Sequence, residues 1–88
     1  MKIHYLSSAL KDIKKIKDKK TKDNIKRIFL QIKEVESLKE LGNLKKMSGH
    51  PSAYRIKIGN YRLGFYYEND VVKIARIVKR NDIYKLFP

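Results

Sequence analysis

The chain contains no cysteine, which excludes disulfides, thiolate metal sites and thiol catalysis. It also lacks any apolar run approaching the roughly 20 residues of a membrane span, and residues 1–10 contain no long apolar segment. We therefore expect a cytoplasmic protein. A length of 88 residues allows one modest hydrophobic core but not two, which predicts a single domain over residues 1–88.

Acidic residues are scarce as well, with 9 Asp and Glu against 22 Lys and Arg, so the formal net charge is +13. Such an excess predicts an acidic partner, which can be nucleic acid, an anionic protein or an anionic membrane. A disordered basic tail is excluded, because 42% of the residues are hydrophobic and they recur periodically. The two histidines, His4 and His50, are far apart and no carboxylate cluster accompanies either, so we expect neither a metal nor a cofactor.

Two stretches in the first half of the chain have apolar residues every three or four positions, as on one face of an α-helix. The first can begin at a Ser7 or Ser8 cap, and the second at an Asp18 or Thr21 cap. Residues 2–6 precede them as a candidate strand. The apolar residues of the two stretches are Leu10, Ile13 and Ile16, and then Ile25, Ile28, Phe29, Ile32 and Val35.

Residues 54–84 predict three strands joined by two-residue turns. Gly59-Asn60 suits a type II′ turn and Asn69-Asp70 a turn with positive φ. Two-residue turns determine the pairing of the strands they join. The expected cross-strand pairs are Ile58 with Tyr61, Lys57 with Arg62, Ile56 with Leu63, Arg55 with Gly64 and Tyr54 with Phe65, followed by Arg62 with Ile77 and Gly64 with Ala75.

The last of these strands, Val71–Val78, is apolar on both faces, so we expect it inside the sheet with the N-terminal strand along its free edge. Residues 45–52 contain glycine and proline and are expected to form a loop. Asn81 or Asp82 can cap a final helical turn. The sequence therefore predicts an α+β fold: an N-terminal strand and a helical hairpin packed on an antiparallel β-meander, with a short C-terminal helical tail.

One face of this sheet carries cations and an aromatic ring: Arg55, Lys57, Arg62, Tyr66 and Lys73. Like charges across a strand pair cost stability, which indicates that the positive field is used. The small residues Gly64 and Ala75 predict a depression beside the cations, and Arg80 and Tyr84 are expected to fold over it. Such a site offers cations to a phosphate and a ring to a base.

Each of these side chains also has a purely structural interpretation. Arg55 and Lys57 can be solvated charges that protect an edge strand from aggregation. Tyr84 can pack in the tail instead of stacking on a base. Arg76 points to the core side in the expected register, so we expect it to form a structural ion pair or to extend its charge to solvent.

Two motifs resemble a known family. The run YRIKIGNYRL at residues 54–63 resembles the central hairpin of the RelE/ParE superfamily of bacterial type II toxins, and VKRNDIY at residues 78–84 resembles its closing motif. The resemblance covers essentially the whole chain and implies a RelE-like fold. It also implies a metal-independent endoribonuclease that inhibits translation by cutting mRNA codons in the ribosomal A site through attack of the RNA 2′-hydroxyl. The implied partners are the ribosome, mRNA and a cognate antitoxin. We expect the antitoxin to be acidic and partly disordered, and to cover the cations or displace the tail.

The resemblance assigns catalytic roles to Lys57 in proton transfer, to Arg62 and Arg80 in phosphate binding, and to Tyr84 in stacking or orientation. An RNA-binding role is expected for the remaining candidates, Arg55, Lys79, Lys73 and Tyr66.

This chain departs from the family pattern at two positions. Lys79 stands where many members have histidine, and Arg55 stands where another lysine is common. Because arginine does not readily release a proton, Arg55 can stabilise charge but is a poor base. Proton transfer therefore falls to Lys57, with Lys79 available to assist it, and we expect neighbouring cations to favour the neutral form of Lys57.

Two other functions remain open. A toxin of the ParE branch would poison DNA gyrase without cutting RNA, and a binding module would hold RNA without cleaving it.

Overall fold

The computed structural model describes residues 1–88 and contains a five-stranded sheet with strand order β1-β5-β4-β3-β2. β1 is parallel to β5, and the other neighbours are antiparallel. The strands are β1 (Lys2–Tyr5), β2 (Leu44–Lys46), β3 (Ala53–Ile58), β4 (Tyr61–Glu68) and β5 (Val71–Lys79), and the helices are α1 (Ser7–Lys15), α2 (Lys19–Glu34), the 3₁₀ turn η1 (Leu38–Glu40) and α3 (Ile83–Leu86). The predicted α+β architecture is confirmed, and the N-terminal strand lies along β5 as expected.

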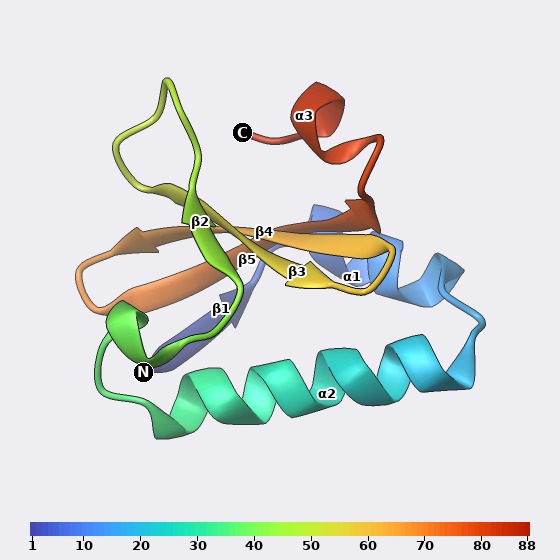
Figure 1. Ribbon diagram of the computed structural model, residues 1–88, viewed down its shortest axis with the longest axis horizontal. Helices are drawn as coiled ribbons and strands as arrows, with labels where there is room; N and C mark the ends of the chain where they lie inside the picture. The colour runs from blue at the N-terminus through green and yellow to red at the C-terminus, as the bar shows by residue number, and fades with distance from the viewer.

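The sheet has two faces with different cover (Figure 1). On the first, which we call the helix-side face, α1 and α2 bury a core of residues that includes Ile32, Leu63 and Phe65. On the second, the tail-side face, α3 and the C-terminal residues lie over β3, β4 and β5. None of the helices combines the length and the apolar character needed to span a membrane.

The two helices begin in different ways. Asp18 caps α2, because its carboxylate accepts the Thr21 N–H at 3.0 Å. The serine cap expected for α1 is wrong: Leu6 is the N-cap residue and makes no side-chain cap bond. The Ser8 hydroxyl instead donates to the Ala75 carbonyl at 2.6 Å. β1 pairs with β5 only as far as Ile74, so Ser8 satisfies a backbone carbonyl that no strand reaches.

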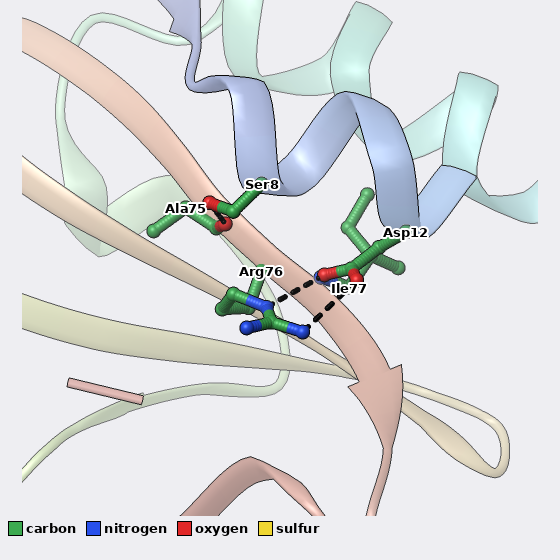
Figure 2. A network of polar contacts seen from close by, with 5 residues as sticks. All are labelled: Ser8, Asp12, Ala75, Arg76 and Ile77. Carbon is green, nitrogen blue, oxygen red and sulfur yellow. Dashed lines mark hydrogen bonds and ion pairs between the residues drawn. The ribbon is translucent and has the colours of Figure 1, made fainter. Parts of the chain in front are cut away.

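An ion pair fastens α1 to the same edge of β5 (Figure 2). Arg76 donates from Nε to Asp12 Oδ2 at 2.8 Å and from a terminal nitrogen to Oδ1 at 3.0 Å. Asp12 Oδ2 also accepts the Ile77 N–H at 3.0 Å. The expectation of a structural ion pair for Arg76 is confirmed.

The first hairpin has the predicted register, including the pairs Lys57 with Arg62 and Arg55 with Gly64. Gly59 has φ of +56°, as the first position of a type II′ turn requires. The second turn has φ of +51° and +62° at Asn69 and Asp70, which confirms the predicted positive φ.

The predicted register of the second hairpin is wrong beyond Ile74, where Arg62 pairs with Val78 and Gly64 with Arg76. Ala75 is an extra residue in β5, which forms a β-bulge. A regular strand would place Ile74 and Ile77 on opposite faces, because they are three residues apart. The bulge restores both to the helix-side core, where they are 0% and 1% exposed.

The loop expected over residues 45–52 begins with a strand instead. β2 pairs along β3, with Leu44 opposite Ile56, Lys45 opposite Arg55 and Lys46 opposite Tyr54. β3 is therefore an interior strand, so the interpretation of Arg55 as protection for an edge strand is wrong. Three residues are too few to show a period of two, which is why the sequence pattern did not reveal β2.

Candidate nucleic-acid site

Cations from two paired strands lie on the tail-side face beside the first hairpin. Lys57 on β3 is directly opposite Arg62 on β4, and Arg55 is opposite Gly64. The neighbours of these residues along each strand, Ile56 and Leu63, point into the helix-side core. Side chains alternate between the faces of a strand, so the cations project to the tail side. We call Arg55, Lys57, Arg62 and Arg80 the cation cluster.

Arg62 is held by the hairpin turn that precedes β4. One terminal nitrogen donates to the carbonyls of Gly59 and Tyr61, both at 2.9 Å. Burial lowers the pKa of Arg62 below its ordinary value, and the charges of Arg55 and Arg80 lower it further. The structure therefore concentrates positive charge at Arg62 instead of neutralising it.

Arg80 leaves β5 at the same end of the sheet, where its backbone N–H donates to the Asn60 carbonyl at 2.9 Å. This bond ties the start of the tail to the first hairpin turn. The charge of the Arg80 side chain also helps to lower the pKa of Arg62.

The Tyr84 side chain is 65% exposed, yet its phenol is not isolated. Its polar contact with the Arg55 side chain is the main cause of a lowered pKa, although desolvation acts in the opposite direction. The charges of Arg55, Lys45 and Arg62 contribute in the same direction as the contact. The tail therefore presents an exposed aromatic ring whose pKa responds to the charges of the cation cluster. The Arg55 Nε itself is buried and has no hydrogen-bond partner.

Lys45 belongs to this site, although the sequence predicts a loop at this position and gives Lys45 no role. A hollow of about 320 Å³ is lined by Lys45, Arg55 and Lys57, together with Asn43 and Leu44. A neighbouring hollow of about 370 Å³ is lined by Lys45, Lys46, Met47, Ser48, Tyr84, Phe87 and Pro88. The only feature of the sequence that points to Lys45 is the lysine pair at 45–46. The pairing of β2 with β3 places Lys45 opposite Arg55.

The depression predicted beside Gly64 and Ala75 is not open, so that expectation is wrong. The tail does fold over this face, as expected, but Phe87 fills the space: a Cβ on Gly64 would lie 2.6 Å from Phe87 Cδ2. Met47, Ala53, Ala75, Ile83 and Phe87 form a second buried cluster on the tail-side face.

Three other candidates lie apart from the cation cluster. Tyr66 packs against Phe87, with ring centroids 5.0 Å apart, and is four residues from Arg62, or about 13 Å along the strand. Lys73 is opposite Tyr66, with its Nζ 4.0 Å from a Glu68 carboxylate oxygen. Lys79 is directly opposite Tyr61, whose side chain packs on the helix-side core. Lys79 therefore lies on the helix-side face, away from the cation cluster.

The arrangement is chemically suited to a phosphodiester. Guanidinium groups bind phosphate oxygens in a planar fork, and an ammonium adds a mobile point charge. An exposed phenol ring provides a surface on which a base can stack. No three His, Asp or Glu side chains gather closely enough to hold a metal ion.

Comparisons with known proteins agree with this architecture. A family model described as the ParE toxin of the type II toxin-antitoxin system parDE matches residues 3–84. Toxin RelE3 of Methanocaldococcus jannaschii is 34% identical over 89 residues, covering all of both chains.

Two solved structures have the same fold. A chain of the RelB-RelE antitoxin-toxin complex from Methanococcus jannaschii matches with a TM-score of 0.81 and 30% identity, over 96% of this chain and 98% of that chain. The YoeB dimer from Staphylococcus aureus matches with a TM-score of 0.72 and 25% identity, over 90% of this chain and 94% of that chain. Since both the family model and a full-length relative cover nearly the whole chain, the chain belongs to the RelE/ParE family of type II toxins.

Proposed function

We propose that this toxin is a ribosome-dependent endoribonuclease that cuts mRNA at the codon in the ribosomal A site and so inhibits translation. The observation that carries the proposal is the placement of Arg55, Lys57, Arg62 and Tyr84 around one end of the first hairpin. A chain carrying a net charge of +13 also has the electrostatic attraction that RNA binding requires.

The reaction needs a base, a site for the charge that develops on phosphorus, and a proton for the leaving oxygen. The RNA 2′-oxygen forms a bond to phosphorus and loses its proton, while the bond from phosphorus to the 5′-oxygen breaks and that oxygen gains a proton. Lys57 transfers protons, and Arg62 and Arg80 bind the phosphate oxygens. Arg55 stabilises the same charge, and Tyr84 stacks on or orients a base.

The test is cleavage of a defined mRNA on purified ribosomes, with the ends mapped. We expect cuts confined to the A-site codon that leave a 2′,3′-cyclic phosphate. Lys57→Met should reduce cleavage by about 10²-fold or more, because an acid–base group contributes about that much. Lys15→Met, which removes an exposed lysine of α1, is the matched control and should cut normally. Near-native cleavage by Lys57→Met would remove this lysine from the mechanism.

A second candidate function is inhibition of DNA gyrase, because the matched family model describes a ParE toxin. Purified gyrase and a cell-free translation extract distinguish the two. An endoribonuclease arrests translation and leaves supercoiling intact, whereas a gyrase poison does the opposite and tolerates removal of the cation cluster. An RNA-binding module that does not cleave would leave the mRNA ends unchanged in the translation extract and would leave supercoiling intact.

We propose that the cognate partner is an acidic antitoxin that supplies an apolar segment. A hollow of about 580 Å³ between α1 and α2 has mostly apolar walls, and its lining also includes three lysines: Lys14, Lys22 and Lys26. This combination favours an apolar segment flanked by acidic residues. The related Methanococcus jannaschii chain was solved as a RelB-RelE antitoxin-toxin complex.

The partner is tested by co-expressing the chain with the protein encoded next to it. Leu10→Glu, at an exposed residue that lines the hollow, should weaken co-purification of the antitoxin. Lys11→Glu alters the adjacent exposed residue outside the lining and should retain it. Equal retention by both variants would place the antitoxin elsewhere on the toxin.

A further inference from the structure

The C-terminal segment is held to the sheet by two buried side chains of the same apolar cluster, Ile83 and Phe87. Phe87 is 2% exposed, and its ring lies against the bare backbone of Gly64, where a Cβ would meet three ring atoms at 2.6 to 2.9 Å. Ala53 and Ala75 are buried in the same cluster as Phe87. Small residues on adjacent strands thus form a seat for the ring.

The seat adjoins the candidate site. Gly64, against which Phe87 packs, is the cross-strand partner of Arg55. Arg55 in turn is the side chain that most strongly lowers the pKa of the Tyr84 hydroxyl. Tyr84 and Phe87 also line one hollow together. The seat of Phe87 on Gly64 is therefore next to the residue that acts on Tyr84.

Tyr84 has little support of its own. It is 65% exposed and belongs to α3, a helix of only four residues. A single helical turn is not stable in isolation, so tertiary contacts must hold it. The buried residues on either side of Tyr84 are Ile83, at 0% exposure, and Phe87, whose N–H donates to the Ile83 carbonyl at 2.8 Å.

We propose that Phe87, seated on Gly64, is a positioning residue that holds Tyr84 against Arg55 and thereby completes the RNA site. The structural half of this inference concerns the protein alone. The consequence for cleavage rests on the proposed endoribonuclease function.

The test measures the phenol pKa of Tyr84 in the free protein, by NMR of ¹³C-labelled tyrosine with Tyr84→Phe to assign the signal. Phe87→Ala and Gly64→Ala should both raise this pKa toward the ordinary tyrosine value, because the tail no longer keeps the hydroxyl beside Arg55, Lys45 and Arg62. Gly64 does not have a positive φ, so its alanine variant tests the seat without straining the backbone.

Two further variants serve as controls. Leu86→Ala alters a neighbouring α3 residue that is 46% exposed, and should leave the Tyr84 pKa unchanged. Phe87→Leu keeps an apolar side chain in the seat and should restore most of the pKa shift. If Phe87→Ala fails to fold, Gly64→Ala and Phe87→Leu carry the measurement.

In the ribosome assay, Phe87→Ala and Gly64→Ala should cut mRNA about 10²-fold more slowly, as expected when a group that positions the RNA is misplaced by about 1 Å. An unchanged Tyr84 pKa in Phe87→Ala and Gly64→Ala overturns the positioning role, whatever the cleavage rate. The two proposals can also fail separately. If the variants raise the Tyr84 pKa but the wild-type protein cuts no RNA, the positioning role is supported and the proposed function is refuted.

Discussion

Lys57 and Arg62 lie directly opposite each other across β3 and β4, although both side chains are positively charged. Like charges at opposed positions of a strand pair destabilise a sheet by a few tenths of a kcal/mol up to about 1 kcal/mol. We therefore expect Lys57→Met to raise the free energy of unfolding by about 0.5 kcal/mol in urea titrations at low salt. The same variant should lose RNA cleavage, so that stability and activity change in opposite directions.

Added salt provides a check on this explanation. Screening weakens the repulsion, so the stability difference between Lys57→Met and wild type should shrink as the ionic strength rises. A difference that stays constant with salt would indicate that the gain comes from the new apolar side chain and not from relief of repulsion.

The ion pair between Asp12 and Arg76 makes a second prediction. Asp12→Ala removes a buried carboxylate and leaves both Arg76 and the Ile77 N–H without their acceptor. We expect a loss of about 2–4 kcal/mol in the free energy of unfolding. Asp23→Ala, at an exposed position of α2, is the control and should change stability little. A similar loss in both variants would show that the pair between α1 and β5 has no special role.

The pKa values of Tyr84 and Tyr67 are predicted to be shifted in opposite directions from that of an ordinary tyrosine. The contact with Arg55 lowers the pKa of Tyr84, whereas the Tyr67 hydroxyl donates to Asp70 at 3.0 Å, which raises its pKa. In an NMR titration of labelled tyrosine, Tyr84 should ionise at a lower pH than an ordinary tyrosine, and Tyr67 at a higher pH. Arg55→Gln should move Tyr84 back toward the ordinary pKa, and Asp70→Asn should do the same for Tyr67.

These shifts also determine the sign of the pH dependence of stability. The pKa of Tyr84 is lower in the folded than in the unfolded chain, so its contribution is absent at neutral pH and appears as the pH rises through the folded pKa. The pKa of Tyr67 is raised, so its contribution is complete below about pH 10 and is lost as the pH rises further. Both signs can be checked by chemical denaturation of Tyr84→Phe, Tyr67→Phe and wild type between neutral and alkaline pH. A stability contribution of Tyr84 that falls as the pH rises, or one of Tyr67 that grows, would contradict the prediction.

Lys45 is predicted to bind RNA through phosphate alone. Lys45→Ala should weaken the binding of single-stranded RNA equally for all sequences and reduce the slope of log affinity against log salt by about 0.7, the value for one phosphate contact on a single strand. Lys33→Ala removes an exposed lysine from α2 and should leave the slope unchanged. A sequence-dependent loss in Lys45→Ala would mean that this lysine contacts a base.

How far the sequence predicts each part of the sheet depends on the range of the interaction that determines it. Turn chemistry at Gly59 determined the whole first hairpin correctly, because every pair follows from the turn. The second turn gave the right pairs only as far as Ile74, since burial of Ile77 against the helices then outweighed regular alternation. The pairing of β2 with β3 has no sequence period, so neither the strand nor Lys45 was predicted.

The candidate site shows the same division. The pair Lys57 and Arg62 was predicted from register, and Arg80 and Tyr84 were predicted from their place after the last strand, while the RelE/ParE resemblance implied their roles. The position of Phe87 was not predicted, because its seat on Gly64 joins residues that local patterns do not relate. A glycine within a strand signals a close approach, but it does not identify the side chain that approaches.

The extra residue Ala75 determines the side from which the chain departs toward its C-terminus. β5 leads directly into the tail. If Ala75 paired with Gly64 instead of bulging out of the ladder, every side chain that follows it in the strand would change face. Val78 would then point toward α1 and α2, and Tyr84 would be carried away from Arg55.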